Sequence, residues 1–125
     1  MARQPIDDPA GTPPSYWAAT ASPAPEIPAF DGSMQADVAV VGAGYTGLSS
    51  ALHLAEAGFK VAVLEAAKTG WGASGRNGGQ IVHSYSRDID VIEKNHGKAV
   101  ADAMGSMAFE GARIIRERVA RYSIE

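Results

Sequence analysis

The clearest hydrophobic pattern in the chain lies between Asp37 and Glu65. An unbroken apolar run at 38–41 precedes a glycine-rich turn, and a second apolar run at 61–64 precedes Glu65. Short continuous apolar runs bounded by turns are typical of parallel strands that are buried on both faces. The pattern therefore predicts strands over Val38–Val41 and Val61–Leu64.

Between these two runs the apolar residues follow a helical spacing. They recur at i, i+3, i+4 and i+7, which gives a helix one apolar stripe for packing on the strands. The stripe consists of Leu48, Ala51, Leu52 and Ala55. Gly58 is placed to end the helix. The order of elements predicts an α/β fold, the N-terminal part of a Rossmann-like domain with parallel strands, incomplete in this chain.

The turn after the first predicted strand has glycines at G-x-G-x-x-G spacing. They are Gly42, Gly44 and Gly47, with Tyr45 and Thr46 between the last two. The first glycine allows a tight exit from the strand, the second lets backbone amides approach a pyrophosphate, and the third lets the helix lie close to the sheet. Because the N-terminus of the helix would face the phosphates, we expect this turn to bind a dinucleotide.

Glu65 stands at the end of the second predicted strand, at about the distance of roughly 20 residues that the fingerprint expects. A carboxylate there can accept hydrogen bonds from the adenosine ribose hydroxyls, and it would repel a 2′-phosphate. The alternative is an ordinary β-α-β unit whose glycines serve turns and packing, with Glu65 solvated. A turn needs only one glycine, so the spacing favours the dinucleotide site.

A second glycine-rich segment occupies residues 70–80, where Ser74, Arg76 and Asn77 lie among the glycines. Such density indicates a backbone in unusual dihedrals or one that lies close against something. The remainder of an extended cofactor is the natural candidate, and a flexible surface loop is the alternative.

The remaining elements are predicted from weaker patterns. Residues 80–84 are compatible with a short strand, and Asp88 is a plausible N-cap for a helix that ends near Gly97. Apolar residues from Val100 to Val119 predict a long amphipathic helix. Its arginines are interpreted as a solvated face that complements the helix dipole; they are Arg113, Arg116, Arg118 and Arg121.

Prolines set the first segment apart, since all 7 lie between Pro5 and Pro28. We therefore expect residues 1–35 to form an arm without a regular helix or central strand, and 36–125 to be the truncated N-terminal part of the nucleotide-binding domain. Tyr16 and Trp17 either anchor the arm to a surface or are incidental aromatics in a disordered leader.

Composition excludes several functional classes. The 125 residues are 46% hydrophobic and 20% charged, with a net charge of -3 and no cysteine, which excludes disulfides, thiolate catalysis and zinc-thiolate sites. No basic cluster suggests nucleic acid, no apolar run approaches the ~18–20 residues of a membrane span, and no secretory signal is evident, so a cytoplasmic location is expected. The histidines, His53, His83 and His96, have no metal-binding spacing.

Only two strands are predicted, and an isolated pair would leave sheet edges and helix faces uncovered. We therefore expect the chain to be the N-terminal portion of a longer protein, called here the full-length parent. The isolated chain is expected to have no turnover and to bind its cofactor poorly.

Two segments carry a family resemblance. Residues 36–49, Ala-Asp-Val-Ala-Val-Val-Gly-Ala-Gly-Tyr-Thr-Gly-Leu-Ser, and residues 70–80, Gly-Trp-Gly-Ala-Ser-Gly-Arg-Asn-Gly-Gly-Gln, resemble the D-amino-acid oxidase superfamily of FAD-dependent oxidoreductases. Residues 15–17, Ser-Tyr-Trp, and 84–86, Ser-Tyr-Ser, more narrowly resemble its gamma-glutamylputrescine oxidase branch.

The resemblance implies an extended FAD, with the first glycine turn at the pyrophosphate and Glu65 at the ribose. Ser74 and Arg76 match positions near the pyrophosphate and ribityl chain. Near the isoalloxazine it implies Asn77, Gly78, Gly79 and Gln80. Arg76 stands about where some relatives tether flavin through histidine, so FAD is expected to be non-covalent.

The implied activity is oxidation of a carbon–nitrogen bond in an amine or amino acid, by hydride transfer to flavin and reoxidation by oxygen. A gamma-glutamylputrescine-like compound is the expected substrate. No catalytic side chain and no oligomeric state is predicted. The alternatives are a nicotinamide-dependent dehydrogenase, which would normally continue with another β-α unit after Glu65, and a non-catalytic dinucleotide-binding fragment.

Overall fold

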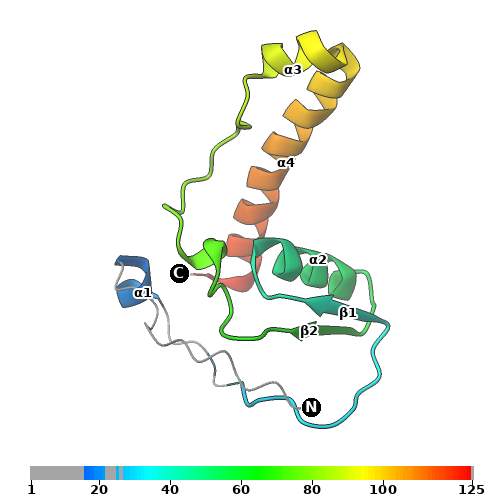
Figure 1. Ribbon diagram of the computed structural model, residues 1–125, viewed down its shortest axis with the longest axis vertical. Helices are drawn as coiled ribbons and strands as arrows, with labels where there is room; N and C mark the ends of the chain where they lie inside the picture. Colours follow the sequence, from blue (N-terminus) through cyan, green and yellow to red (C-terminus); the bar gives the residue numbers. More distant parts are fainter. Residues whose placement is uncertain (1–15, 22–24, 26, 125) are drawn as a thin grey trace. The chain divides into compact units, whose positions relative to one another are not determined.

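The computed structural model describes residues 16–21, 25 and 27–124. This part of the chain divides into two compact units, of which the first ends at Gly78 and the second begins at Gly79 (Figure 1). Each unit is described separately below.

The first unit contains the predicted strand-helix-strand arrangement. Strands β1 (Val38–Val41) and β2 (Val61–Leu64) are parallel, and the register pairs Val38 with Val61 and Val41 with Leu64. Helix α2 (Tyr45–Glu56) connects them and packs against both (Figure 1). The predicted α/β arrangement with parallel strands is therefore confirmed.

One face of this strand pair is uncovered in the first unit, so the prediction of strands buried on both faces is wrong for the described chain. Along β1 the residues alternate between half-buried and exposed, and Val41 is 86% exposed. The physical reason is that α2 covers one side and no described element of the unit covers the other.

The face of α2 that covers the sheet differs from the predicted stripe. Of the predicted stripe, Ala51 is buried and Leu52 is half-buried, whereas Leu48 is 40% exposed and Ala55 is exposed; Leu54, outside the stripe, is half-buried. The predicted stripe was therefore wrong in part, because several apolar spacings fit the same helix. The predicted end of the helix is confirmed, since α2 stops at Glu56 and Gly58 follows with φ of 93°.

The second unit is a pair of helices preceded by an irregular segment. Residues 80–84 form no strand, so that prediction is wrong; a strand needs a neighbour for its backbone hydrogen bonds, and the described residues of the second unit, 79–124, offer none. Helix α3 (Ile89–His96) starts after Asp88, as predicted, although the Asp88 side chain makes no capping hydrogen bond. Gly97, with φ of 85°, ends α3 and directly precedes α4 (Lys98–Tyr122).

Side chains hold the irregular segment to α4. The ring of His83 stacks on Phe109 with 5.0 Å between centroids, and the Tyr85 hydroxyl donates to the carbonyl of Met104 at 2.7 Å. Within the described residues of this unit, the buried positions are Ile92, Ala101 and Ala112.

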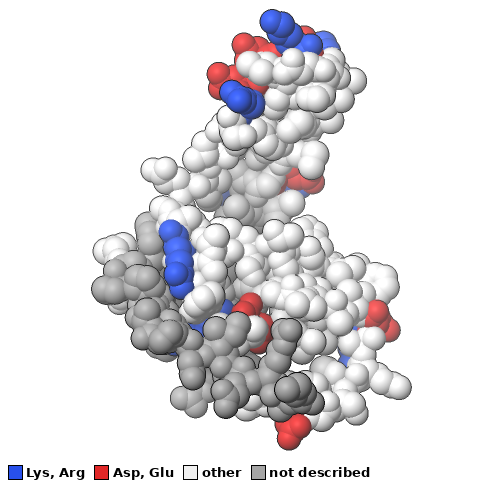
Figure 2. All heavy atoms as spheres, in the orientation of Figure 1, with Lys and Arg blue, Asp and Glu red and all other residues white. Residues whose placement is uncertain are grey.

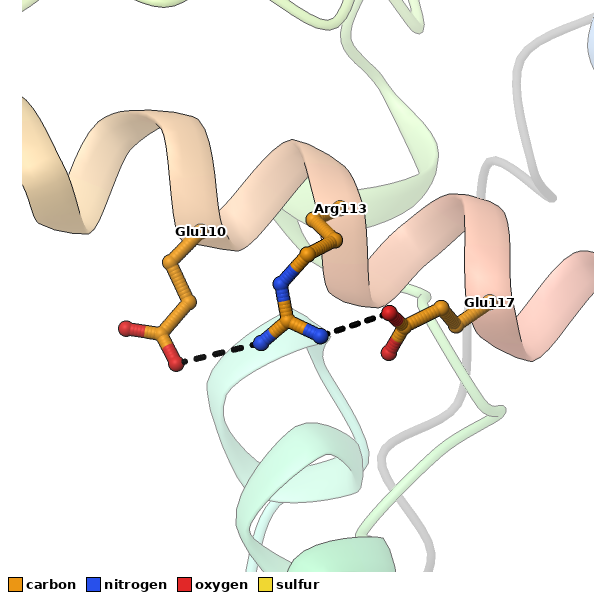
Figure 3. Close-up of polar contacts among 3 residues, drawn as sticks. All are labelled: Glu110, Arg113 and Glu117. Carbon is orange, nitrogen blue, oxygen red and sulfur yellow. Dashed lines mark hydrogen bonds and ion pairs between the residues drawn. The ribbon is translucent and has the colours of Figure 1, made fainter.

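The charged residues of α4 are exposed except Arg118, which is half-buried, so the prediction of a solvated arginine face is wrong at that position. Arg113 bridges Glu110 and Glu117 along the helix, all three being more than half exposed (Figure 3). Exposed ion pairs of this spacing contribute little to helix stability, because solvent screens the two charges. On the visible face, acidic and basic side chains are mixed near the end where α3 meets α4, so no single-sign patch forms there (Figure 2). Arg113 thus lies on a solvated face, as predicted.

The proline-rich arm lies mostly outside the described residues, which begin at Tyr16. The expectation that it contains no regular helix is wrong at α1 (Tyr16–Thr20), a single turn in a stretch that contains no proline. The Thr20 hydroxyl donates to the carbonyl of Tyr16 at 2.9 Å, and the Tyr16 side chain is 72% exposed. The side chain of Trp17 is outside the described part.

Candidate dinucleotide-binding site

The first glycine of the fingerprint adopts a conformation that other residues rarely reach. Gly42 has φ of 98°, and its N–H donates to the carbonyl of Leu64 at 2.7 Å, which extends the pairing of the two strands by one bond. The chain then leaves the sheet toward α2. This geometry supports the predicted role of Gly42 in a tight exit from the strand.

The last glycine of the fingerprint lies where the helix approaches the turn. A Cβ atom on Gly47 would overlap the carbonyl oxygen of Gly42 and would lie 3.3 Å from a methyl group of Val40. The overlapping partner is backbone, which cannot rotate away as a side chain could. Only glycine therefore lets α2 start this close to the turn.

The middle glycine of the fingerprint, Gly44, is required for a reason that the sequence did not suggest. Gly44 is the N-cap of α2 with φ of -86° and ψ of -175°, an extended conformation open to any residue. A Cβ atom there would lie 3.0 Å from the hydroxyl oxygen of Ser74. The absent side chain therefore leaves room for Ser74, from the second glycine-rich loop.

Glu65 fixes the turn from the end of β2. One carboxylate oxygen, Oε2, accepts the N–H of Ala43 at 2.6 Å, and the other, Oε1, accepts the N–H of Ala67 at 3.0 Å. The Ala43 bond, followed by the Ala67 bond and by a weaker interaction with the Ala66 amide, lowers the pKa of Glu65 below its ordinary value, and desolvation opposes this effect. A carboxylate offers about four acceptor positions, so capacity remains beyond these backbone amides for a further donor such as a ribose hydroxyl.

The lowered pKa of Glu65 predicts a pH effect on stability. The ionised carboxylate is favoured in the folded state, so its stabilisation is present above the ordinary glutamate pKa of about 4.3 and is lost as pH falls through the lower folded pKa. We expect the stability difference between the full-length parent and its Glu65→Gln variant to shrink between about pH 6 and about pH 3. Thermal unfolding across this range measures it, and a difference that is constant with pH would contradict the assignment.

The second glycine-rich loop is tied to the first. Gly70, with φ of 70°, donates its N–H to the carbonyl of Ala43 at 2.9 Å. A Cβ atom on Gly75 would overlap the carbonyl oxygen of Gly70, so the loop closes tightly on itself. These contacts favour an ordered loop over the alternative of a flexible surface loop.

Arg76 and Trp71 pair within this loop. The guanidinium carbon of Arg76 lies 4.7 Å from the centre of the Trp71 ring, and its Nε donates to the Trp71 carbonyl at 2.9 Å. A cation held over an aromatic face keeps its charge while its position is restricted. Arg76 is exposed, so its remaining guanidinium donors are accessible to an anion.

Ser74, Asn77 and Tyr45 come together where this loop meets α2. The N–H of Tyr45 donates to the Ser74 hydroxyl oxygen at 2.9 Å. The side-chain amide of Asn77 donates to the carbonyl of Ser74 at 2.9 Å and lies 3.3 Å from the Tyr45 hydroxyl. Residues 45 and 74 are far apart in sequence, and spacing alone did not predict this contact.

The other predicted site residues are Thr46, Gly78, Gly79 and Gln80. Thr46 is exposed in the first turn of α2, and Gly78 is exposed at the end of the first unit. Gly79 and Gln80 belong to the second unit, so their relation to the fingerprint stays a prediction. Ala43 was missed by sequence reasoning, although its position between two fingerprint glycines and its exposure of only 3% mark it as a packed point of the turn.

The donors and acceptors of this region suit a dinucleotide. By helix geometry, the N–H groups of Thr46 and Gly47 have no acceptor inside α2, and anions are favoured at such an end. Glu65 has capacity for the hydroxyls of a ribose. Throughout the described ranges no group of three or more His, Cys, Asp or Glu side chains is arranged to hold a metal ion. None of the described helices combines the length and hydropathy needed to cross a bilayer.

Comparison with known proteins gives a family match and several curated relatives. The family described as FAD dependent oxidoreductase (DAO) matches residues 37–125. Gamma-glutamylputrescine oxidoreductase of Escherichia coli (strain K12) is 63% identical over 111 residues, which cover 89% of this chain and 26% of that protein. No solved structure gives a significant match.

Two further relatives are named probable oxidoreductase OrdL. The protein from Haemophilus influenzae is 50% identical over 90 residues, covering 72% of this chain and 21% of its own length. The protein from Rhizobium meliloti is 40% identical over 101 residues, covering 81% of this chain and 24% of its own length. The chain thus spans about a quarter of the length of the curated relatives it matches.

Proposed function

We propose that this chain, which belongs to the FAD dependent oxidoreductase family, forms part of an FAD site in a larger enzyme. Its share of the site would bind the pyrophosphate and the ribose. One observation carries the proposal. The Glu65 carboxylate holds the N–H of Ala43 inside the glycine turn and keeps lone pairs for a ribose, beside the N-terminus of α2. This combination would serve a dinucleotide, and a plain β-α-β unit would not need it.

Residues of the first unit would divide the binding between them. The turn from Gly42 to Gly47 would receive the pyrophosphate at the N-terminus of α2. Ser74 and Arg76 would add a hydroxyl and a cationic donor on the side of the second loop. Asn77, Gly78, Gly79 and Gln80 remain proposed contacts of the flavin end, on the family resemblance.

The proposed reaction is oxidation of a carbon–nitrogen bond in an amine or amino acid. Bound FAD supplies hydride acceptance, and this chain's residues bind and orient it without covalent attachment. An amine such as gamma-glutamylputrescine is the proposed substrate, because one relative is named gamma-glutamylputrescine oxidoreductase. Oxygen as the acceptor and a cytoplasmic location are part of the proposal, which names no catalytic residue.

The test is the flavin content of the full-length parent. We expect the purified parent to be yellow and to release free FAD on heat denaturation, because non-covalent flavin leaves with the fold. A thermal shift with added FAD should raise the melting temperature, since a ligand that binds only the folded state stabilises it. A colourless protein that is protected by NAD and not by FAD would favour the nicotinamide-dependent alternative.

The structure of the segment after Glu65 disfavours that alternative. A nicotinamide-dependent domain would normally continue with a β-α unit, whereas residues 66–88 contain no strand and only a short 3-10 turn at Ala73–Gly75. Inactivity of the isolated chain stays a prediction, which peroxide production from an amine by the 125-residue chain would overturn.

A further inference from the structure

Asn77 closes the turn that carries Ser74. Its side-chain amide donates to the carbonyl of Ala73 at 3.1 Å and to that of Ser74 at 2.9 Å. The amide nitrogen of Asn77 thus holds two successive carbonyls of the loop, and the Tyr45 hydroxyl at 3.3 Å is its third neighbour. A side chain that reaches back three and four residues in this way fixes the local backbone.

The shape of this turn decides where the Ser74 hydroxyl lies. That hydroxyl accepts the N–H of Tyr45 at 2.9 Å, which is the first amide of α2. Gly44 leaves room for it, since a Cβ atom there would lie 3.0 Å from the same oxygen. Ser74 therefore caps α2 from 29 residues further along the chain. In ordinary helices the cap comes from the residue just before the first turn.

We infer that Asn77 is a positioning residue that latches the second glycine-rich loop onto the N-terminus of α2 before any cofactor binds. The inference rests on the proposed function, because the ligand served is the pyrophosphate of a dinucleotide. In the latched state the Ser74 oxygen is occupied by the Tyr45 amide, and its own proton is left to donate to a phosphate oxygen. The cofactor then meets a loop that is already ordered, and its binding does not have to order it.

Hydrogen exchange in the cofactor-free full-length parent tests the latch directly. In the Asn77→Ala variant we expect the amides of residues 73–77 and of Tyr45 to exchange roughly fivefold faster or more, as for the loss of one net hydrogen bond. Asn77→Asp keeps the size of the side chain and loses both donors, so it should behave like Asn77→Ala. Asn95→Ala, on the exposed surface of α3, is the matched control and should leave these amides unchanged.

Variants of Ser74 separate the latch from a general loss of structure. Ser74→Ala should expose the Tyr45 amide to exchange while residues 73–77 stay protected, because the Asn77 bonds use backbone carbonyls. Ser74→Thr keeps the hydroxyl and should restore protection of Tyr45. Ser106→Ala, exposed on α4, is the control for Ser74→Ala. FAD titration of the same proteins should give a dissociation constant raised about fivefold or more for Asn77→Ala.

The outcomes distinguish the inference from the proposed function. If the Tyr45 amide exchanges at the same rate in the parent, Asn77→Ala and Asn77→Asp, the latch is wrong whatever FAD does. If Asn77→Ala does not fold, the exchange rates of Asn77→Asp, Ser74→Ala and Ser74→Thr still test the latch. If the parent takes up no flavin, the proposed function fails while the exchange rates still decide whether the latch exists.

Discussion

Replacement of Gly47 by alanine is expected to abolish flavin uptake by the full-length parent and to destabilise its fold. The added methyl group would overlap the carbonyl oxygen of Gly42 and crowd Val40, and the overlapping atom is backbone in a turn that itself needs φ of 98°. We expect the free energy of unfolding to fall by about 3 kcal/mol, the upper end of the usual range for an overpacked site. Urea unfolding and flavin absorbance measure the two effects.

Gly111→Ala is the matched control for this substitution. Gly111 lies within α4, and a Cβ atom there would have no neighbour within 4 Å. Because alanine favours a helix interior over glycine, the variant should be more stable by about 0.5–1 kcal/mol and should keep its flavin. A Gly47→Ala protein with normal stability and normal flavin content would show that α2 does not need this close approach.

Replacement of Glu65 by glutamine is expected to weaken FAD binding by roughly 10- to 100-fold, the range for loss of hydrogen bonds to a charged group. Glutamine has one acceptor oxygen, so either the N–H of Ala43 or the N–H of Ala67 must face the NH₂ group, which is also a donor. The glycine turn is thereby loosened in the same step that removes the carboxylate from the ribose. Titration of the cofactor-free parent with FAD measures the change.

Glu93→Gln, on the exposed surface of α3, provides the control for loss of one carboxylate at constant size. It should bind FAD as the parent does. Equal affinities of the parent and the Glu65→Gln variant would remove Glu65 from the site and leave it as a strand end.

Local patterns were sufficient for most elements of the fold. The apolar runs located β1 and β2, and helical spacing with Gly58 and Gly97 as stops located α2 and the end of α3. These features depend on interactions within a few residues, which a single sequence displays directly. Glu65 was found because the fingerprint fixes its distance from the glycines.

The remaining features depend on contacts that the sequence does not display. The proposed strand at 80–84 had suitable residues but no partner strand among the described residues. The packed face of α2 could not be chosen from the sequence, because the apolar residue Leu48 stays exposed. The contact between Ser74 and the amide of Tyr45 joins two loops, and neither residue type predicts a contact with the other. Sequence therefore located the candidate site, while the way its two loops fit together required the fold.

The double use of Glu65 constrains any attempt to re-engineer cofactor choice. Admission of a cofactor with a phosphorylated ribose would call for a shorter or neutral side chain at this position, since the carboxylate repels that phosphate. The same change would release the amides of Ala43 and Ala67 that the carboxylate now holds. A designer would have to supply a new acceptor for those amides first, so selectivity and folding cannot be altered independently at this residue.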